Sequence, residues 1–313
     1  MKILITGGCG YVGSNLIPSL LKDGHTVINI DTQWFGNYIS NHKNLTNIKL
    51  NLSEINKLKI KKIDIVIHLA SIANDPMAEL DKNLSWETSA LNTFKLLNFM
   101  KKVKAKRIIY ASSGSVYGIS KKPNVTENTD LKPISLYNKV KMITERVLLS
   151  FSKEFEIFII RPATVCGYSP RMRLDVTVNA LTFSALSKKK IKVFGGKQVR
   201  PNIHIDDMCS LYKFFLKLNK KYAGIYNAGF ENKSILDIAN IVKNKIPSKI
   251  KIYKDKSDPR SYRLNSSKLI RAGFKPKKTI KDAIIELKEN YDNKKLVDKS
   301  NYHSLSWLKK ILL

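Results

Sequence analysis

Short runs of apolar residues recur along the first half of the chain, and stretches with the spacing of amphipathic helices separate them. Short runs rich in β-branched residues predict buried strands, and the stretches between them predict helices. The predicted strands cover residues 2–6, 26–31, 47–52, 64–70, 107–112 and 157–163. Because strands and helices alternate, we predict an α/β fold in which helices cover both faces of a doubly wound parallel sheet.

Beyond residue 168 this alternation becomes irregular. A helix-like run covers residues 176–186, and short apolar runs at 191–194 and 250–253 predict further strands. We therefore expect two interleaved domains. The first comprises residues 1–168 and about 203–230, and a smaller, irregular α/β lobe comprises about 169–202 and 231–313.

The first predicted strand leads directly into a glycine-rich turn, with Gly7, Gly10 and Gly13 spaced G-x-x-G-x-x-G before a helix-like run. A diphosphate at a helix N-terminus needs exposed backbone N–H groups and no side chain in the way, which glycine provides. The second predicted strand ends at Asp31, about 20 residues further on, where a carboxylate can hold both ribose hydroxyls of an adenosine. This pattern predicts a Rossmann-type dinucleotide site, and Asp31 favours NAD over NADP.

A candidate catalytic pair lies in the stretch YNKVK at residues 137–141, where the apolar periodicity predicts a helix. Tyr137 and Lys141 are four residues apart, so they would share one helix face. An ammonium group beside a phenol stabilises the phenolate, so Tyr137 could take a hydroxyl proton while hydride leaves the same carbon. Such pairs are common by chance, but a serine-rich segment that follows a predicted strand strengthens the interpretation. The hydroxyl candidates there are Ser112, Ser113 and Ser115.

Length and composition limit the class of protein. With 313 residues the chain can form one dinucleotide-binding domain and a smaller companion. It has no uninterrupted apolar run of roughly 18 to 20 residues, as a membrane span needs, and no signal-peptide pattern. We therefore expect a cytoplasmic protein without membrane insertion. Its three scattered cysteines, with no C-x-x-C pair, indicate neither a disulfide framework nor a metal site.

The formal net charge of +31 raises nucleic acid as a partner. The basic runs, however, are dispersed between the predicted elements, have little aromatic interleaving and match no nucleic-acid-binding motif. We expect no specific nucleic-acid partner. Such a charge would still raise the local concentration of anionic nucleotide substrates.

Taken together, the ordered motifs resemble the extended short-chain dehydrogenase/reductase family, in its nucleotide-sugar epimerase and dehydratase branch, over nearly the whole chain. The segments that carry the resemblance are residues 6–13, 31, 113–118, 137–141, 161–162, 193–207 and 226–229. The resemblance implies NAD as cofactor and a nucleotide-diphosphate sugar as substrate. It also implies a homodimer that pairs through helices at about residues 86–103 and 136–152.

The resemblance implies a role for each motif residue. Tyr137 would be the acid/base, Lys141 would hold the nicotinamide ribose and stabilise the phenolate, and Ser113 would bind the reacting hydroxyl. Asn51 stands where relatives often have aspartate, although its amide oxygen can still accept a hydrogen bond. The implied cofactor contacts are Gly7, Gly10, Tyr11, Val12, Gly13, Asp31, Asn51, Leu52, Leu69, Ala70, Tyr137 and Lys141.

Arginines suit a diphosphate because they form bidentate hydrogen bonds. The resemblance implies that Arg200 and Arg260 clamp the phosphates of the nucleotide sugar. We interpret His204 as a structural residue where the chain returns to the first domain. Further substrate-binding candidates, in the segment that enters the second lobe, are Arg171, Arg173 and Asn179.

The serine loop also bears on the reaction. Dehydratases of this branch carry an Asp-Glu pair directly after the catalytic hydroxyl residue, where this chain has Gly114 and Ser115. Without a carboxyl group there, 4,6-elimination loses its acid/base partner. The resemblance therefore implies a 4-epimerase, which removes a hydride at C4 and returns it through a 4-keto intermediate. One alternative is a nucleotide-sugar 4-dehydrogenase or ketoreductase, including enzymes that act on GDP-heptose in bacterial surface-polysaccharide synthesis. Another is a dinucleotide-binding protein without catalysis, against which the intact Tyr137 and Lys141 argue.

Overall fold

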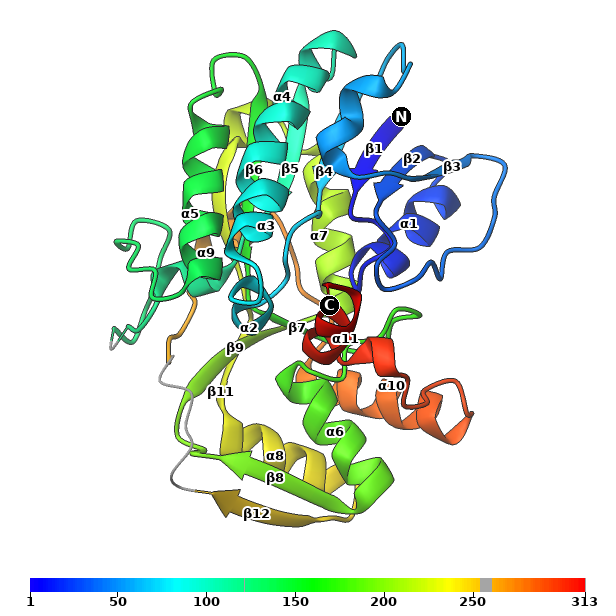
Figure 1. Ribbon diagram of the computed structural model, residues 1–313. Coiled ribbons are helices and arrows are strands. Elements are labelled where there is room, and N and C mark those ends of the chain that lie inside the picture. The colour runs from blue at the N-terminus through cyan, green and yellow to red at the C-terminus, as the bar shows by residue number, and fades with distance from the viewer. Residues whose placement is uncertain (121, 254–260, 313) are drawn as a thin grey trace.

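The computed structural model describes residues 1–120, 122–253 and 261–312. Its centre is a seven-stranded sheet in the order β10-β6-β5-β4-β1-β2-β3, with every neighbouring pair parallel (Figure 1). The predicted doubly wound α/β fold is thus confirmed. The strands of this sheet are β1 (Lys2–Thr6), β2 (Thr26–Asp31), β3 (Leu45–Lys49), β4 (Ile65–His68), β5 (Arg107–Ala111), β6 (Glu156–Pro162) and β10 (Gly224–Ala228).

Helices cover both faces of this sheet (Figure 1). Successive side chains of a strand point to opposite faces, so a continuously apolar strand is buried on both sides. In β1, Ile3 and Ile5 belong to the apolar cluster that includes α1 and α7, whereas Leu4 belongs to the cluster on the other face, with α4 and α5. The flanking helices are α1 (Gly13–Lys22), α4 (Asn92–Lys102), α5 (Leu136–Leu149) and α7 (Ile205–Lys217).

The strand order places a ligand site at one edge of the sheet. From β1 the chain moves outward through β2 and β3, and then returns to continue on the other side of β1 with β4, β5 and β6. In such sheets the crevice beyond the carboxyl ends of the strands, where the order switches, is the place where ligands bind. Here the switch lies between β1 and β4, where the glycine turn follows the carboxyl end of β1.

Smaller sheets and helices form the rest of the molecule, drawn in the lower part of Figure 1. The strand β9 pairs in parallel with β7 and antiparallel with β11, while β8 pairs in parallel with β12. Helices α6, α8 and α10 contribute to a separate apolar cluster. The elements are β7 (Thr164–Cys166), α6 (Thr177–Lys188), β8 (Lys190–Phe194), β9 (Val199–His204), β11 (Glu231–Ser234), α8 (Ile235–Lys245), β12 (Lys249–Tyr253) and α10 (Ile280–Asp292). The helix predicted at 176–186 and the strands predicted at 191–194 and 250–253 are therefore present.

Of the four shortest helices, two follow β4, one precedes α10 and one lies at the end of the described chain. They are α2 (Asp75–Ala78), α3 (Lys82–Trp86), α9 (Ser267–Arg271) and α11 (Ser304–Leu312). The buried Leu308 of α11 shares an apolar cluster with Met77 of α2 and, at its border, Tyr137. The C-terminal helix thus packs beside the switch point although its sequence is remote from it.

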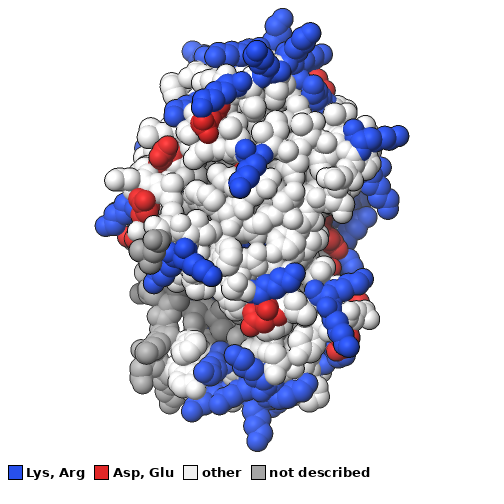
Figure 2. All heavy atoms as spheres, turned by 45° about the vertical axis from the view of Figure 1, so that its right-hand side comes forward, with Lys and Arg blue, Asp and Glu red and all other residues white. Residues whose placement is uncertain are grey.

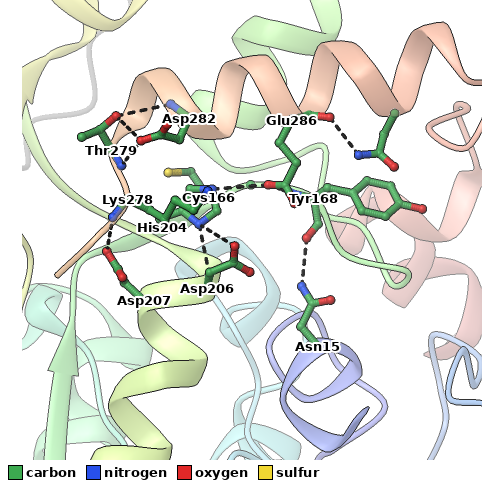
Figure 3. A network of polar contacts seen from close by, with 12 residues as sticks. Asn15, Cys166, Tyr168, His204, Asp206, Asp207, Lys278, Thr279, Asp282 and Glu286 are labelled. Carbon is green, nitrogen blue, oxygen red and sulfur yellow. Dashed lines mark hydrogen bonds and ion pairs between the residues drawn. The ribbon is translucent and has the colours of Figure 1, made fainter. Parts of the chain in front are cut away.

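His204 lies at the junction of β9 and α7 and is 3% exposed. Its Nδ1 accepts the backbone N–H of Asp206 (3.1 Å), and its Nε2 lies 3.3 Å from Oε2 of Glu286 in α10 (Figure 3). The neighbouring Asp207 accepts the backbone N–H of Lys278 (2.9 Å), so the start of α7 is joined to the segment before α10 as well. These contacts support the interpretation of His204 as a structural residue.

Lysine and arginine side chains are spread over the face in Figure 2, toward both ends of the molecule and singly between them. Acidic side chains are few on this face. None of the described helices has the length and hydropathy needed to cross a bilayer.

Candidate active site

A cleft of about 630 Å³ opens at the carboxyl edge of the central sheet. Its walls come from the segments that follow β1 to β6, from the loop before α6, from β9 and from the start of α11. The structure brings most of the predicted site residues together here. Those that line the cleft are Gly7, Gly10, Tyr11, Val12, Gly13, Asp31, Asn51, Leu52, Leu69, Ala70, Ser113, Tyr137 and Arg200.

The turn after β1 is shaped by glycines. Gly7 has a φ of +76°, which favours glycine, and a Cβ on Gly13 would lie 2.3 Å from the carbonyl oxygen of Gly8. Gly8 itself has no room for a side chain, because a Cβ there would lie 2.1 Å from Oδ1 of Asn29. That oxygen accepts the backbone N–H of Gly8 (3.0 Å), which holds the turn on β2. The result is a cradle without side chains at the N-terminus of α1, which fits a diphosphate.

Asp31 closes β2 opposite this turn. Its Oδ2 accepts the backbone N–H of Cys9 (2.9 Å), and its Oδ1 accepts that of Gln33 (2.6 Å). Burial raises the pKa of the Asp31 carboxyl, while these two hydrogen bonds oppose the rise. Each carboxylate oxygen has capacity for a second hydrogen bond, so Asp31 can also accept ribose hydroxyls from the cleft. Cradle and carboxylate together fit an NAD-type dinucleotide.

Helix α5 carries the predicted catalytic pair. Its start is capped by Ser135, whose Oγ accepts the backbone N–H of Asn138 (3.2 Å), and this sets Tyr137 in the first turn, facing the cleft. One turn later, Lys141 is 3% exposed and donates from Nζ to the carbonyl oxygen of Ala111 at the end of β5 (2.6 Å). The Nζ atom lies 5.9 Å from the centre of the Tyr137 ring. The Lys141 ammonium group is thus held beside the Tyr137 ring.

The three serines after β5 differ in what they contact. The hydroxyl of Ser112 donates to the Glu145 carboxylate, so it is engaged in the core. The Ser115 hydroxyl donates to Oδ1 of Asn138 (2.6 Å), and the oxygens of Ser113 and Ser115 are 2.7 Å apart. Because Ser115 gives its only proton to Asn138, Ser113 is the donor to Ser115. The Ser113 oxygen can then accept the hydrogen bond of a hydroxyl in the cleft.

One predicted substrate contact, Asn179, is not brought to the cleft. Asn179 of α6 is fully buried, and its amide accepts the backbone N–H of Gly167 (3.0 Å) and donates to the Tyr11 hydroxyl (3.0 Å) and the Arg173 carbonyl (3.0 Å). Because these hydrogen bonds engage the Asn179 amide within the protein, the structure does not support its assignment to substrate binding. Arg260 lies outside the described residues.

Several cleft residues were missed by the sequence patterns. Trp34 and Phe35 follow Asp31, and Ser304 and Leu305 come from α11. Nothing in the apolar periodicity of α11 indicates which surface that helix covers. Asn29, which holds the glycine turn, could have been found from the sequence. A polar residue inside an apolar strand signals that a backbone group nearby needs a partner.

Burial of Lys141 has a measurable consequence. It lowers the pKa of this ammonium group from 10.5 to about 7, although Glu145 opposes the shift. Between those pH values the unfolded chain binds more protons than the folded one, so the free energy of unfolding rises with pH. We expect the melting temperature of the ligand-free protein to rise more between pH 7 and 9 than that of Lys141→Met. Both proteins share nearly the same overall charge repulsion, and equal slopes in a thermal scan would contradict the prediction.

Comparison with known proteins gives a consistent result. The model of the NAD dependent epimerase/dehydratase family matches residues 3–229. A Bacillus subtilis (strain 168) protein described as an uncharacterized UDP-glucose epimerase, YtcB, is 33% identical over 223 residues, which cover 66% of this chain and 70% of that protein. The UDP-glucose 4-epimerase of Lactobacillus helveticus is 27% identical over 278 residues, covering 77% of this chain and 82% of that enzyme.

Among solved structures, a mutant UDP-glucuronic acid 4-epimerase from Bacillus cereus is similar over 93% of this chain and 100% of its own, with a TM-score of 0.80 and 26% identity. That structure contains UDP-4-deoxy-4-fluoro-glucuronic acid and NAD. The family match covers the glycine turn, Asp31, the serine loop and the Tyr137–Lys141 pair, and it confirms the resemblance seen in the motifs. The chain belongs to the NAD dependent epimerase/dehydratase family.

Proposed function

We propose that this protein is an NAD-dependent nucleotide-sugar 4-epimerase. The observation that carries the proposal is the convergence of Tyr137, Lys141 and Ser113 on a cleft that also contains the glycine turn and Asp31. The relatives described above are named for UDP-sugars, which supports a nucleoside-diphosphate sugar as substrate. The smaller sheets and helices, which carry Arg200, would form the nucleotide-sugar-binding lobe.

Each residue has a definable part in the reaction. NAD, when bound, supplies the acceptor and donor of the C4 hydride. Tyr137 removes the proton of the C4 hydroxyl and later returns one, while Lys141 beside it stabilises the phenolate. Ser113 would turn its hydroxyl proton from Ser115 to the sugar, donate a hydrogen bond to the C4 oxygen and so fix its direction. Arg200 lines the cleft from β9 and is 8% exposed, a position from which it would pair with a substrate diphosphate.

The serine loop argues against dehydration as the main reaction. Elimination needs a second acid/base group near the sugar, and the positions after Ser113 are Gly114 and Ser115. Gly114 is closely packed, since a Cβ there would lie 2.8 Å from Cδ1 of Leu264 and 3.1 Å from the carbonyl oxygen of Pro162. The loop therefore has neither a carboxylate nor space for one at this position.

The reaction can be identified by product analysis. The purified protein would be incubated with UDP-glucose, UDP-galactose, UDP-glucuronic acid, dTDP-glucose and a GDP-heptose, without added NAD, and the sugars followed by NMR. We expect the C4 epimer of one of them, with no net reduction of NAD. Stoichiometric NADH with a keto product would identify a dehydrogenase instead. A 4-keto-6-deoxy sugar would identify a dehydratase.

Replacement of Asp31 tests the cofactor preference. We expect Asp31→Ala to raise the Kd for NAD by at least about tenfold to a hundredfold, which is the effect of losing one charge-assisted hydrogen bond of about 1.5–3 kcal/mol. Discrimination against NADP should fall too, since the carboxylate no longer repels a 2′-phosphate. Calorimetric titration of both dinucleotides measures these effects. Asp31→Asn is the matched control for lost charge, and an unaltered preference in Asp31→Ala would contradict the assignment.

We propose that the protein is a homodimer that pairs through α4 and α5. Leu91 and Phe94 are 60% and 49% exposed, and together with Trp86 they form the apolar part of a hollow at the start of α4. Apolar side chains this exposed on one surface are typical of an interface. Sedimentation equilibrium should give twice the chain mass of 35.6 kDa, and a monomer mass would contradict the proposal.

We propose a cytoplasmic location. Cys9, Cys166 and Cys209 are all unpaired and buried, as is usual where thiols stay reduced. Cell fractionation with an antibody against the protein tests this, and recovery from an extracytoplasmic fraction would contradict it.

A further inference from the structure

One cleft arginine, Arg171, is buried without an ion-pair partner in the described part of the chain. Arg171 lines the cleft and is 3% exposed. Its Nη1 donates to the carbonyl oxygen of Met172 (3.2 Å) and its Nη2 to Oγ of Ser304 (3.1 Å), while its Nε has no partner among the described residues. Asp175, the acidic residue closest in sequence, is paired instead with Arg173, at 2.9 Å and 3.0 Å.

Arg171 is held beside the glycine turn by the residues that precede it. The hydroxyl of Ser169 donates to the carbonyl oxygen of Tyr11 (2.8 Å), within the turn itself. The side-chain amide of Asn15, in the first turn of α1, donates to the carbonyl oxygen of Tyr168 (2.9 Å), as Figure 3 shows. Segment 168–171 is therefore fastened to the N-terminus of α1, where backbone N–H groups already favour an anion.

The guanidinium group is also fixed in orientation. It stacks on the Phe35 ring, with 4.3 Å between Cζ and the ring centre, and Phe35 belongs to the loop that follows Asp31. The C-terminal segment holds this loop, because Asn301 donates to the carbonyl oxygen of Phe35 (2.9 Å) and the Trp307 indole donates to that of Trp34 (2.7 Å). Stacking and these hydrogen bonds fix the guanidinium group in position before any ligand binds, which lowers the entropic cost of binding.

Among the described residues no carboxylate forms an ion pair with Arg171, and Asp175 and Asp31 act on it only at longer range. A buried cation without a close counter-ion is costly, and a bound anion offsets that cost. Burial lowers the pKa of Arg171 to about 10, so the group is still charged at neutral pH. Arg173, which has its own carboxylate, needs no such ligand. The contrast between two arginines so close in sequence indicates that Arg171 is kept for a ligand of opposite charge.

We propose that Arg171 binds the diphosphate of the dinucleotide from the side opposite the glycine turn. The inference rests on the proposed use of NAD in this cleft. A nucleotide-sugar diphosphate has the same chemistry, but Phe35, Asp31 and the Tyr11 turn lie around Arg171 on the side predicted for the dinucleotide. The C-terminal helix then acts on cofactor affinity through Ser304 and the Phe35 loop.

The test uses the full chain, freed of bound nucleotide, and two variants, Arg171→Met and Arg171→Lys. Calorimetry with NAD and, separately, with UDP gives both affinities without an activity assay. We expect the Kd for NAD to rise about tenfold to a hundredfold in Arg171→Met, with partial recovery in Arg171→Lys, while the Kd for UDP stays unchanged. Arg107→Met is the matched control, because Arg107 is also an arginine of low exposure but pairs with Glu156 (2.6 Å) outside the cleft.

Thermal unfolding separates binding from a structural role. Without NAD, Arg171→Met should melt at the wild-type temperature or above it, since the substitution removes an uncompensated buried charge. At an NAD concentration that saturates the wild type, the wild type should gain the full stabilisation from binding, and Arg171→Met should gain less. A lower melting temperature without NAD, combined with an unchanged NAD affinity, would overturn the proposal. So would a loss confined to UDP, which would assign Arg171 to the substrate. Neither reading depends on whether the enzyme proves to be an epimerase.

Discussion

Replacing Tyr137 by phenylalanine should lower kcat by about 10²- to 10⁴-fold while the protein still folds and binds NAD. The substitution removes only the phenolic oxygen, the group that faces the cleft beside the Lys141 ammonium. The ring remains, and it is the ring that packs against the apolar cluster of Met77 and Leu308. The loss should therefore appear in turnover and not in the melting temperature.

Turnover of the preferred sugar, measured together with NAD content after denaturation, checks this expectation. Tyr226→Phe is the matched control: the same atom is lost, but Tyr226 lies in β10 and its hydroxyl donates to the carbonyl oxygen of Tyr222 (2.6 Å), outside the cleft. Its kcat should be close to that of the wild type. Unchanged turnover in Tyr137→Phe would remove this tyrosine from the mechanism.

Arg161→Met should destabilise the protein by about 3–5 kcal/mol, because it leaves a buried carboxylate without its counter-ion. Arg161 in β6 and Glu145 in α5 form an ion pair with a shortest N–O distance of 2.6 Å, and their side chains are 3% and 2% exposed. The Glu145 carboxylate also accepts from Ser112, and Arg161 donates to the Tyr117 hydroxyl (2.8 Å). This network fastens the helix that carries Tyr137 and Lys141 to the central sheet.

Urea unfolding of the variant and the wild type gives the difference directly. Lys101→Met is a suitable control, since Lys101 and Glu154 are also 2.6 Å apart but are 46% and 47% exposed. Water and counter-ions screen that pair, so its loss should cost less than about 1 kcal/mol. Similar losses of unfolding free energy in the two variants would show that burial does not explain the contribution of the Arg161–Glu145 pair to stability.

The differing fates of the substrate candidates show where local patterns stop being informative. Asn179 and Arg171 are equally plausible from their place in the chain. The first, however, is fully buried and makes three hydrogen bonds, while the second lines the cleft and its Nε has no partner in the part of the chain that the structure describes. Likewise Ser112 and Ser113 are adjacent, and only the contact of Ser112 with Glu145 separates their roles. In each case the decision rests on partners from distant parts of the chain.

Local spacing along the chain is enough to predict the strand and helix pattern, the glycine turn, Asp31 and the Tyr137–Lys141 pair. These features depend on spacing within a few residues, where the periods of helix and strand dictate which side chains share a face. Which residues surround that pair in the cleft depends instead on contacts between distant parts of the chain. Trp307, for example, donates to the carbonyl oxygen of Trp34 across 273 positions of sequence. Such contacts follow from how whole elements pack to bury apolar surface, and no local period encodes that arrangement.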